Sequence, residues 1–94
     1  MENPNQIDSI LAEREKRYGS FLEHARVTLR IKNVLRTGLN WTRLEADQKE
    51  ALDMIAHKIG RILNGDPDYA DSWVDIAGYA KLVVDRLEKE NRND

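Results

Sequence analysis

Cysteine is absent from this chain of 94 residues, and long apolar runs are absent as well. Without cysteine there can be no disulfide bond and no thiolate metal site, which excludes the small secreted scaffolds that depend on them. No apolar run approaches the roughly 20 residues that a membrane-spanning helix needs, so a membrane protein is not expected. The N-terminus has no basic stretch followed by an apolar run, as a signal peptide would, and a cytoplasmic location is therefore predicted.

An excess of charge of one sign is also missing, because 15 Lys and Arg residues stand against 17 Asp and Glu residues, for a formal net charge of −2. General binding to nucleic acid is not expected, since phosphate backbones attract a basic excess, although a local basic face remains possible. Hydrophobic residues make up 40% of the chain, which is enough for one small core and not for two. Residues 1–94 are therefore predicted to form a single domain, with frayed tails at about 1–5 and 90–94.

Proline and glycine are scarce, so that two prolines and five glycines interrupt long stretches of helix-favouring residues. This composition predicts an all-α fold, a small helical bundle with a short N-terminal helix and three longer helices. The first helix is expected over 6–17. The second is expected to run to about residue 36, after a capping-box pattern of Ser20 and Glu23.

The second half of the chain predicts two long helices joined by a short turn. The third helix should start between 43 and 47, because Thr42 and Glu45 repeat the capping-box pattern, and should end at Leu63. The turn Asn64–Pro67 combines a glycine for a left-handed helix end, an aspartate as cap and a proline for the first position of a fourth helix, which extends to about residue 90. Because the turn is short, the last two helices are predicted to pack as an antiparallel hairpin.

The second helix is apolar over more than a narrow stripe, with Phe21, Leu22, Ala25, Val27, Leu29, Ile31, Val34 and Leu35. A face this wide indicates contact on two sides, with a neighbour in the same chain and with another subunit. A homodimer is therefore predicted, through the second helix and parts of the fourth.

Polar stripes run along the facing sides of the predicted hairpin. On the third helix the stripe includes Glu50, Asp53, His57 and Arg61, and on the fourth it includes Asp71, Asp75 and Gly78. Pairing across the turn would place His57 opposite Asp75, Arg61 opposite Asp71 and Asp53 opposite Tyr79. Opposed carboxylates can hold Mg²⁺, which prefers oxygen ligands and bridges to phosphates, so Glu50, Asp53, Asp71 and Asp75 are candidate metal ligands. The same residues could equally form cross-helix polar pairs that stabilise the fold.

A second polar group lies around the first turn of the chain. Arg17, Tyr18 and His24 could contact phosphate and base, because arginine grips phosphate with a planar fork and aromatic rings stack on bases. An ordinary helix–helix corner is the simpler interpretation. Gly60 and Gly78 lie inside helices, where glycine lowers helix stability by about 1 kcal/mol relative to alanine. Such glycines indicate either tight helix packing or close approach of a ligand.

Three segments carry a resemblance: Arg17–Phe21, Glu50–Pro67 and Asp71–Ala80. Together they resemble a family of small phage and prophage proteins of uncharacterised function, over about residues 13–88. More distantly, the pattern is similar to the all-α nucleoside triphosphate pyrophosphohydrolases of the MazG type, which carry an acidic pair on one helix and a second pair on the next. Glu50 and Asp53 match the first pair, and Asp71 with Asp75 match the second at a spacing of four where that family has three.

The resemblance implies a Mg²⁺-dependent nucleotide pyrophosphohydrolase, with Glu50, Asp53 and Asp75 as catalytic carboxylates. The residues expected to bind the nucleotide are Arg17, Tyr18, His24, His57, Lys58, Arg61 and Tyr79. The alternative is a protein without enzymatic activity, which either sequesters a nucleotide signal or blocks a host protein. Small size, mixed charge and a broad apolar helix fit both interpretations.

Overall fold

The computed structural model describes residues 4–92 and is helical almost throughout. The helices are α1 (Pro4–Tyr18), α2 (Phe21–Arg36), α3 (Ala46–Asn64) and α4 (Ala70–Arg92), with a short 3₁₀ helix, η1 (Trp41–Arg43), between α2 and α3. The described part of the chain has no strand, which confirms the predicted all-α fold. No helix in it is long and apolar enough to cross a membrane. Of the tails expected to fray, residues 4, 5 and 90–92 are helical, and residues 1–3 and 93–94 lie outside the described residues.

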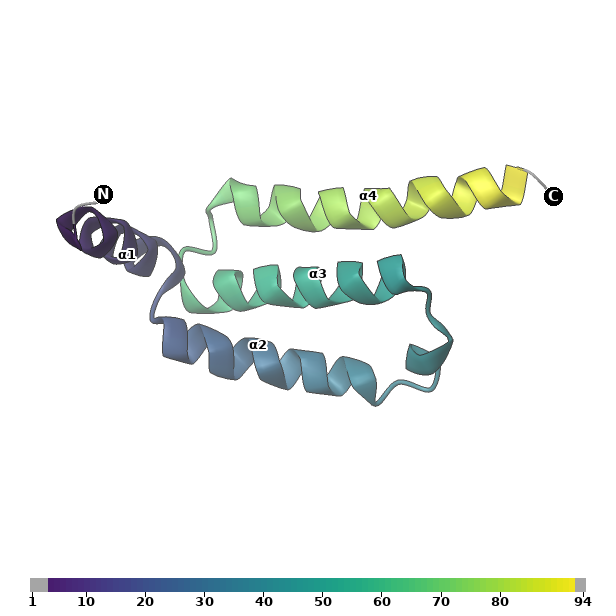
Figure 1. Cartoon of the computed structure of the whole chain (residues 1–94), viewed down its shortest axis with the longest axis horizontal. Coiled ribbons are helices and arrows are strands. Elements are labelled where there is room, and N and C mark those ends of the chain that lie inside the picture. The colour runs from purple at the N-terminus through teal and green to yellow at the C-terminus, as the bar shows by residue number, and fades with distance from the viewer. Residues whose placement is uncertain (1–3, 93–94) are drawn as a thin grey trace.

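Helices α2, α3 and α4 lie side by side in one layer with α3 in the middle, and α1 projects from one end of it (Figure 1). Each neighbouring pair in the layer is antiparallel (Figure 1), so the predicted hairpin of α3 and α4 is confirmed. The end of α1 lies beside the turn that joins α3 to α4. This arrangement brings residues of the first turn of the chain next to residues near position 60.

Helix ends follow local capping chemistry in two places. At α2, the Ser20 hydroxyl accepts a hydrogen bond from the Glu23 backbone N–H at 3.5 Å, which is one half of the predicted capping box. The Glu23 carboxylate accepts from Arg26 at 2.6 Å instead of completing the box. At α3, the capping box is formed by Glu45 and Gln48, whose side chain accepts from the Glu45 backbone N–H at 2.8 Å. The predicted box of Thr42 and Glu45 is wrong, because Thr42 is part of η1 and the chain has not yet turned into α3.

The turn between α3 and α4 differs from the prediction. Helix α4 begins at Ala70 rather than at Pro67, because Asp66 closes a separate turn: its carboxylate accepts from the Asp68 backbone N–H at 2.9 Å and its carbonyl accepts from the Tyr69 N–H at 3.3 Å. Gly65 has φ −122°, so it does not adopt the left-handed conformation that was predicted. Glycine is needed there for space, since a Cβ atom would overlap the backbone of α1 at Arg17.

A second glycine completes this contact from the other side. Gly19 has φ +78°, in the left-handed region, and a Cβ atom on it would overlap the Asn64 carbonyl oxygen. The Asp66 backbone N–H donates to the Arg17 carbonyl at 2.7 Å. The end of α1 is therefore fixed against the end of α3 by backbone contact. Any residue other than glycine at these two positions would place a Cβ atom in the way.

The two mid-helix glycines have different surroundings. A Cβ atom on Gly60 would overlap the Thr28 hydroxyl and lie 3.1 Å from His24, so α2 and α3 approach closely here, as the helix-packing interpretation predicts. A Cβ atom on Gly78 would meet nothing within 4 Å. Packing among the described residues therefore does not explain Gly78.

The layer has two unlike sides, which follow from the helical repeat of about 100° per residue. On α3, Asp53 contacts α2 and Lys58 contacts α4. Between these contacts one side of the helix carries charged residues, whereas the other carries apolar residues and Gln48. The polar side shows Glu50, His57 and Arg61. The apolar side comprises Val27, Ile31 and Val34 of α2, Leu52, Ile55, Ile59 and Leu63 of α3, and Trp73, Ile76, Ala80, Val84 and Leu87 of α4.

The core between the helices is small. Among the described apolar residues, Ala51 and Ala56 of α3 are the buried ones, at 7% and 1% exposure. A single layer of three helices has no second layer to enclose larger side chains, so they remain half-buried or exposed.

Candidate functional site

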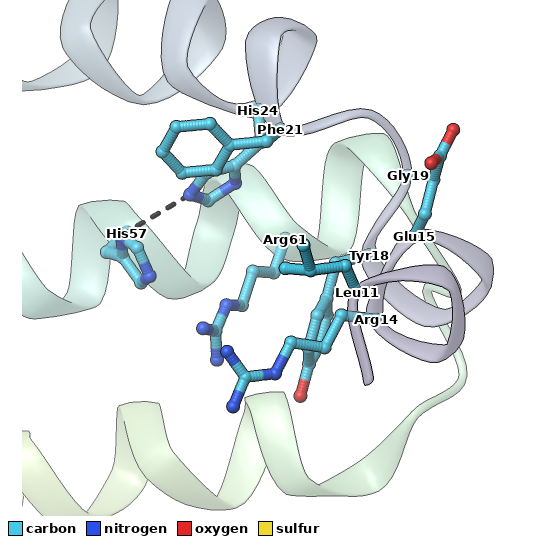
Figure 2. Close-up of a pocket in the computed structure, with 9 residues that line it drawn as sticks. All are labelled: Leu11, Arg14, Glu15, Tyr18, Gly19, Phe21, His24, His57 and Arg61. Atoms are coloured by element: carbon cyan, nitrogen blue, oxygen red, sulfur yellow. Dashed lines mark hydrogen bonds between the residues drawn. The ribbon is translucent and has the colours of Figure 1, made fainter. Parts of the chain in front are cut away.

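A pocket of about 500 Å³ opens on the polar side, at the corner where α1, α2 and α3 meet (Figure 2). It is lined by Leu11, Arg14, Glu15, Tyr18, Gly19, Phe21, His24, His57 and Arg61. Most of these residues come in pairs three or four positions apart on one helix, which places both members of a pair on the same face. The glycine contact between the ends of α1 and α3 fixes the corner and therefore the shape of the pocket.

Two arginines form the charged wall of the pocket. The Arg61 guanidinium lies over the Tyr18 ring, 4.2 Å from its centroid. Figure 2 shows the Arg14 guanidinium beside that of Arg61, and the Glu15 carboxylate pointing away from both. Among the ion pairs of the described residues, none includes Arg14 or Arg61. Two cations that line one pocket without a carboxylate partner can hold an anion.

Two histidines form the floor. His24 Nε2 lies 3.4 Å from His57 Nδ1, and the rings meet edge to face with their centroids 4.6 Å apart. Burial lowers the pKa of His24, and it lowers the pKa of His57 to about 4, with the positive charge of Arg61 as a second cause. Both rings are therefore neutral at pH 7. A neutral imidazole carries one N–H donor and one acceptor, so the pair can share one hydrogen bond and present another to a ligand.

Aromatic surface is available at the mouth of the pocket. Phe21 is 80% exposed, with its ring centroid 6.3 Å from that of His24. Tyr18 contacts Tyr69 edge to face at 6.1 Å, and the guanidinium of Arg17 lies 4.5 Å from the Tyr69 ring centroid. The pocket thus offers cations, neutral hydrogen-bonding rings and an exposed apolar ring within one small volume.

The structure gathers part of the nucleotide-binding set predicted from the sequence. Tyr18, His24, His57 and Arg61 line the pocket, whereas Arg17 lies beside it and donates from Nη1 to the Tyr69 hydroxyl at 3.3 Å. Sequence reasoning missed Arg14, although it lies four residues before Tyr18 and hence on the same helical face.

Phe21 was also missed as a pocket residue, because it was interpreted as a packing residue of α2. Its 80% exposure shows that nothing in the described chain covers it.

Lys58 and Tyr79 lie away from the pocket. Lys58 is 9% exposed and its ammonium contacts the Asp75 carboxylate at 2.9 Å across α3 and α4. Tyr79 is half-buried on α4. Asp75 therefore pairs with Lys58 and His57 with His24, in place of the predicted pairing of His57 with Asp75.

The other predicted metal ligands are separate from one another. Asp53 accepts two hydrogen bonds from Arg36, at 3.2 and 2.9 Å, and Asp71 accepts one from the Tyr69 hydroxyl at 2.8 Å. Glu50 is exposed on the polar side. Within residues 4–92, no three His, Asp or Glu side chains are grouped so as to hold a metal ion.

The fold and the pocket together define a small all-α protein with an arginine-lined site at a corner of three helices. The chain belongs to the family described as "Domain of unknown function (DUF6378)", whose model matches residues 5–86. The matched segment contains every residue that lines the pocket. This confirms the prediction of an uncharacterised family. No curated protein and no solved structure matches the chain.

Proposed function

We propose that the protein binds a nucleotide in this pocket and acts by binding rather than by hydrolysis. The observation that supports the proposal is the pair of adjacent guanidinium groups, Arg14 and Arg61, which lack a carboxylate partner among the described residues. Free arginines beside aromatic rings favour a ligand that is both anionic and flat, which describes a nucleotide.

Each group of pocket residues is suited to one part of a nucleotide. The two guanidinium forks match phosphate oxygens in geometry and charge. The exposed Phe21 ring offers a face on which a base can stack, and stacking of this kind contributes about 1–3 kcal/mol per base. The neutral His57 ring can donate or accept a hydrogen bond at the base or sugar. A volume of about 500 Å³ lies within the range of roughly 300–1,000 Å³ that small-molecule sites occupy.

A second candidate is the Mg²⁺-dependent nucleoside triphosphate pyrophosphohydrolase that the resemblance implies. Glu50 and Asp71 lie on the polar side, and Asp53 and Asp75 lie at its borders, so all four carboxylates remain close to the side that carries the pocket. In this interpretation Arg36 and Lys58 would have to release Asp53 and Asp75 before Mg²⁺ could bind. The existing ion pairs therefore favour binding without turnover.

The resemblance to small phage proteins suggests a setting for this activity. A phage-type protein of this size would act in the cytoplasm of the host cell, where it could sequester a nucleotide signal. Blocking of a host protein is the remaining form of the non-enzymatic alternative.

Isothermal titration calorimetry with nucleoside mono-, di- and triphosphates, with and without Mg²⁺, tests the proposal. The expected result is binding of at least one nucleotide without Mg²⁺, weakened at least about tenfold by Arg61→Ala or Arg14→Ala, because a charge-assisted hydrogen bond contributes about 1.5–3 kcal/mol. Arg26→Ala is the control, because Arg26 is exposed and already paired with Glu23 at 2.6 Å.

Chromatography of the same samples after incubation separates the two candidates. Release of pyrophosphate that depends on Mg²⁺ and is lost in Glu50→Gln would support the hydrolase instead. Absence of binding to every nucleotide would refute both.

A further inference from the structure

The molecule exposes more surface than a folded chain of its mass should. Its accessible surface is 7270 Å², whereas the size relation for monomeric proteins gives about 5,600 Å² for 10.9 kDa. The radius of gyration is 16.5 Å, against about 12 Å for a compact chain of this length. The excess of about 1,700 Å² is close to what one subunit contributes to a permanent homodimer, roughly 1,000–2,500 Å².

Part of this excess is apolar surface on the apolar side of the layer. On the apolar side, Val34 is 68% exposed, Leu63 66% and Trp73 55%. Val84 and Leu87 continue the same stripe along α4, at 45% and 37%. A contiguous apolar face over α3 and α4, extended by Val27, Ile31 and Val34 of α2, is of the kind that marks an interaction site in a soluble protein.

On α3 and α4 the charged residues lie away from the centre of this side, whereas on α2 Glu23 and Arg30 lie in line with Val27 and Val34. Three ion pairs join α3 to its neighbours, Asp53 with Arg36, Lys58 with Asp75 and Asp47 with Arg86, and they involve residues on the polar side or at its borders. The apolar stripe of α4 runs from Trp73 to Leu87 through Ile76, Ala80 and Val84, over more than four helical turns without a charged residue. Depletion of charge at the centre of a face is characteristic of obligate interfaces.

We propose that a second copy of this chain covers the apolar side, so that two three-helix layers pack face to face in a homodimer. A flat face is complementary to itself, and a two-fold axis through it closes the assembly with one contact surface. Two layers then enclose a core made of the facing residues of α2, α3 and α4. The central helix α3 contributes as much to this interface as the second and fourth helices, from which the sequence alone predicts it.

A membrane surface is a weaker candidate for this face. Peripheral helices that lie on membranes combine an apolar face with an excess of Lys and Arg. The chain has a formal net charge of −2, which supplies no such excess. The candidate nucleotide pocket lies on the opposite side of the layer and stays open in the dimer.

Light scattering of the full chain on a size-exclusion column tests the proposal. The expected mass is that of two chains, against 10.9 kDa for one, over the low- to high-micromolar range. Val84→Glu places a charge on the apolar side and should raise the dissociation constant of the dimer at least about tenfold. Ala80→Glu should do the same while keeping every large apolar side chain of the monomer, which separates loss of the interface from loss of folding.

Leu82→Glu is the matched control. Leu82 is 68% exposed on the same helix, two residues from Val84, but on the polar side. The mass of this variant should stay that of two chains. A mass of one chain for the wild type, or an equal effect of Leu82→Glu and Val84→Glu on the mass, would overturn the proposal.

Discussion

The histidine pair is a residue-level feature whose charge depends on its surroundings. His24 is 6% exposed, and its Nδ1 atom has no hydrogen-bond partner among the described residues. A charged imidazolium at this position would lose hydration without gaining a carboxylate, so the neutral form is favoured. An anion bound by Arg14 and Arg61 would change this balance, because a nearby negative charge raises the pKa of both histidines.

The free energy of unfolding should fall as the solution is acidified, because the pKa values of these histidines are lower in the folded chain than in the unfolded chain. The pKa of His57 is lowered from 6.5 to about 4 in the fold. Between these values the unfolded chain binds more protons, so the free energy of unfolding decreases as pH falls from 6.5 towards 4. For a half-buried group that solvent screens in part, the loss is on the order of 1 kcal/mol. Urea unfolding at pH 7 and pH 5 measures it.

His57→Gln serves as the comparison, because glutamine does not titrate. The decrease between pH 7 and pH 5 should be smaller in this variant than in the wild type. Equal decreases in the two proteins would contradict the assignment to His57.

The Lys58–Asp75 ion pair leads to a second prediction about single residues. Lys58 is 9% exposed, so Asp75→Ala leaves a buried ammonium without its partner at 2.9 Å and should lower the free energy of unfolding by about 1–3 kcal/mol. Asp85→Ala removes a similar pair, with Lys81, that is exposed, and should change it by less than about 0.5 kcal/mol. Thermal melts followed by circular dichroism compare the two. Similar shifts in both variants would show that burial of Lys58 is unimportant.

At the scale of elements, the sequence predicts what local chemistry decides. The four helices, the Ser20 cap and the antiparallel hairpin all depend on residues close together in the chain, and each is confirmed. The start of α4 was predicted wrongly because Asp66 closes a turn of its own with Asp68 and Tyr69. The conformation of Gly65 was predicted wrongly because it depends on contact with the end of α1, more than forty residues away. Local patterns do not contain that contact.

The two mid-helix glycines should respond to substitution in opposite directions. Gly78→Ala should raise the free energy of unfolding by about 0.5–1 kcal/mol, because alanine is the better helix former and nothing lies within 4 Å of the new Cβ atom. Gly60→Ala should lower it by about 1–3 kcal/mol, since the methyl group would overlap Thr28 between α2 and α3. Urea unfolding of both variants measures the pair. A destabilised Gly78→Ala would indicate that a ligand or partner approaches that position.

At the scale of the whole molecule, the layer separates two surfaces. The polar side carries the pocket and the apolar side carries the proposed dimer contact. The sequence predicted four of the pocket residues by type. It did not predict that α1 would also contribute Leu11, Arg14 and Glu15, because α1 reaches the corner through the close contact of Gly19 and Gly65 with backbone. The acidic stripes were equally visible in the sequence. Their partners, Arg36 and Lys58, became evident only when the helices were placed side by side.

Folding and association should therefore be coupled. With Ala51 and Ala56 as the buried apolar residues of the described chain, a single copy gains little from burial, and the apolar side must contribute much of the stability. Mass action then makes the melting temperature rise with protein concentration, which it does not do for a monomer. Melts over a hundredfold range of concentration should show this rise for the wild type and for Leu82→Glu. In Val84→Glu the melting temperature should be lower at every concentration, whereas a wild-type melting temperature that does not change with concentration would show that one layer is stable alone.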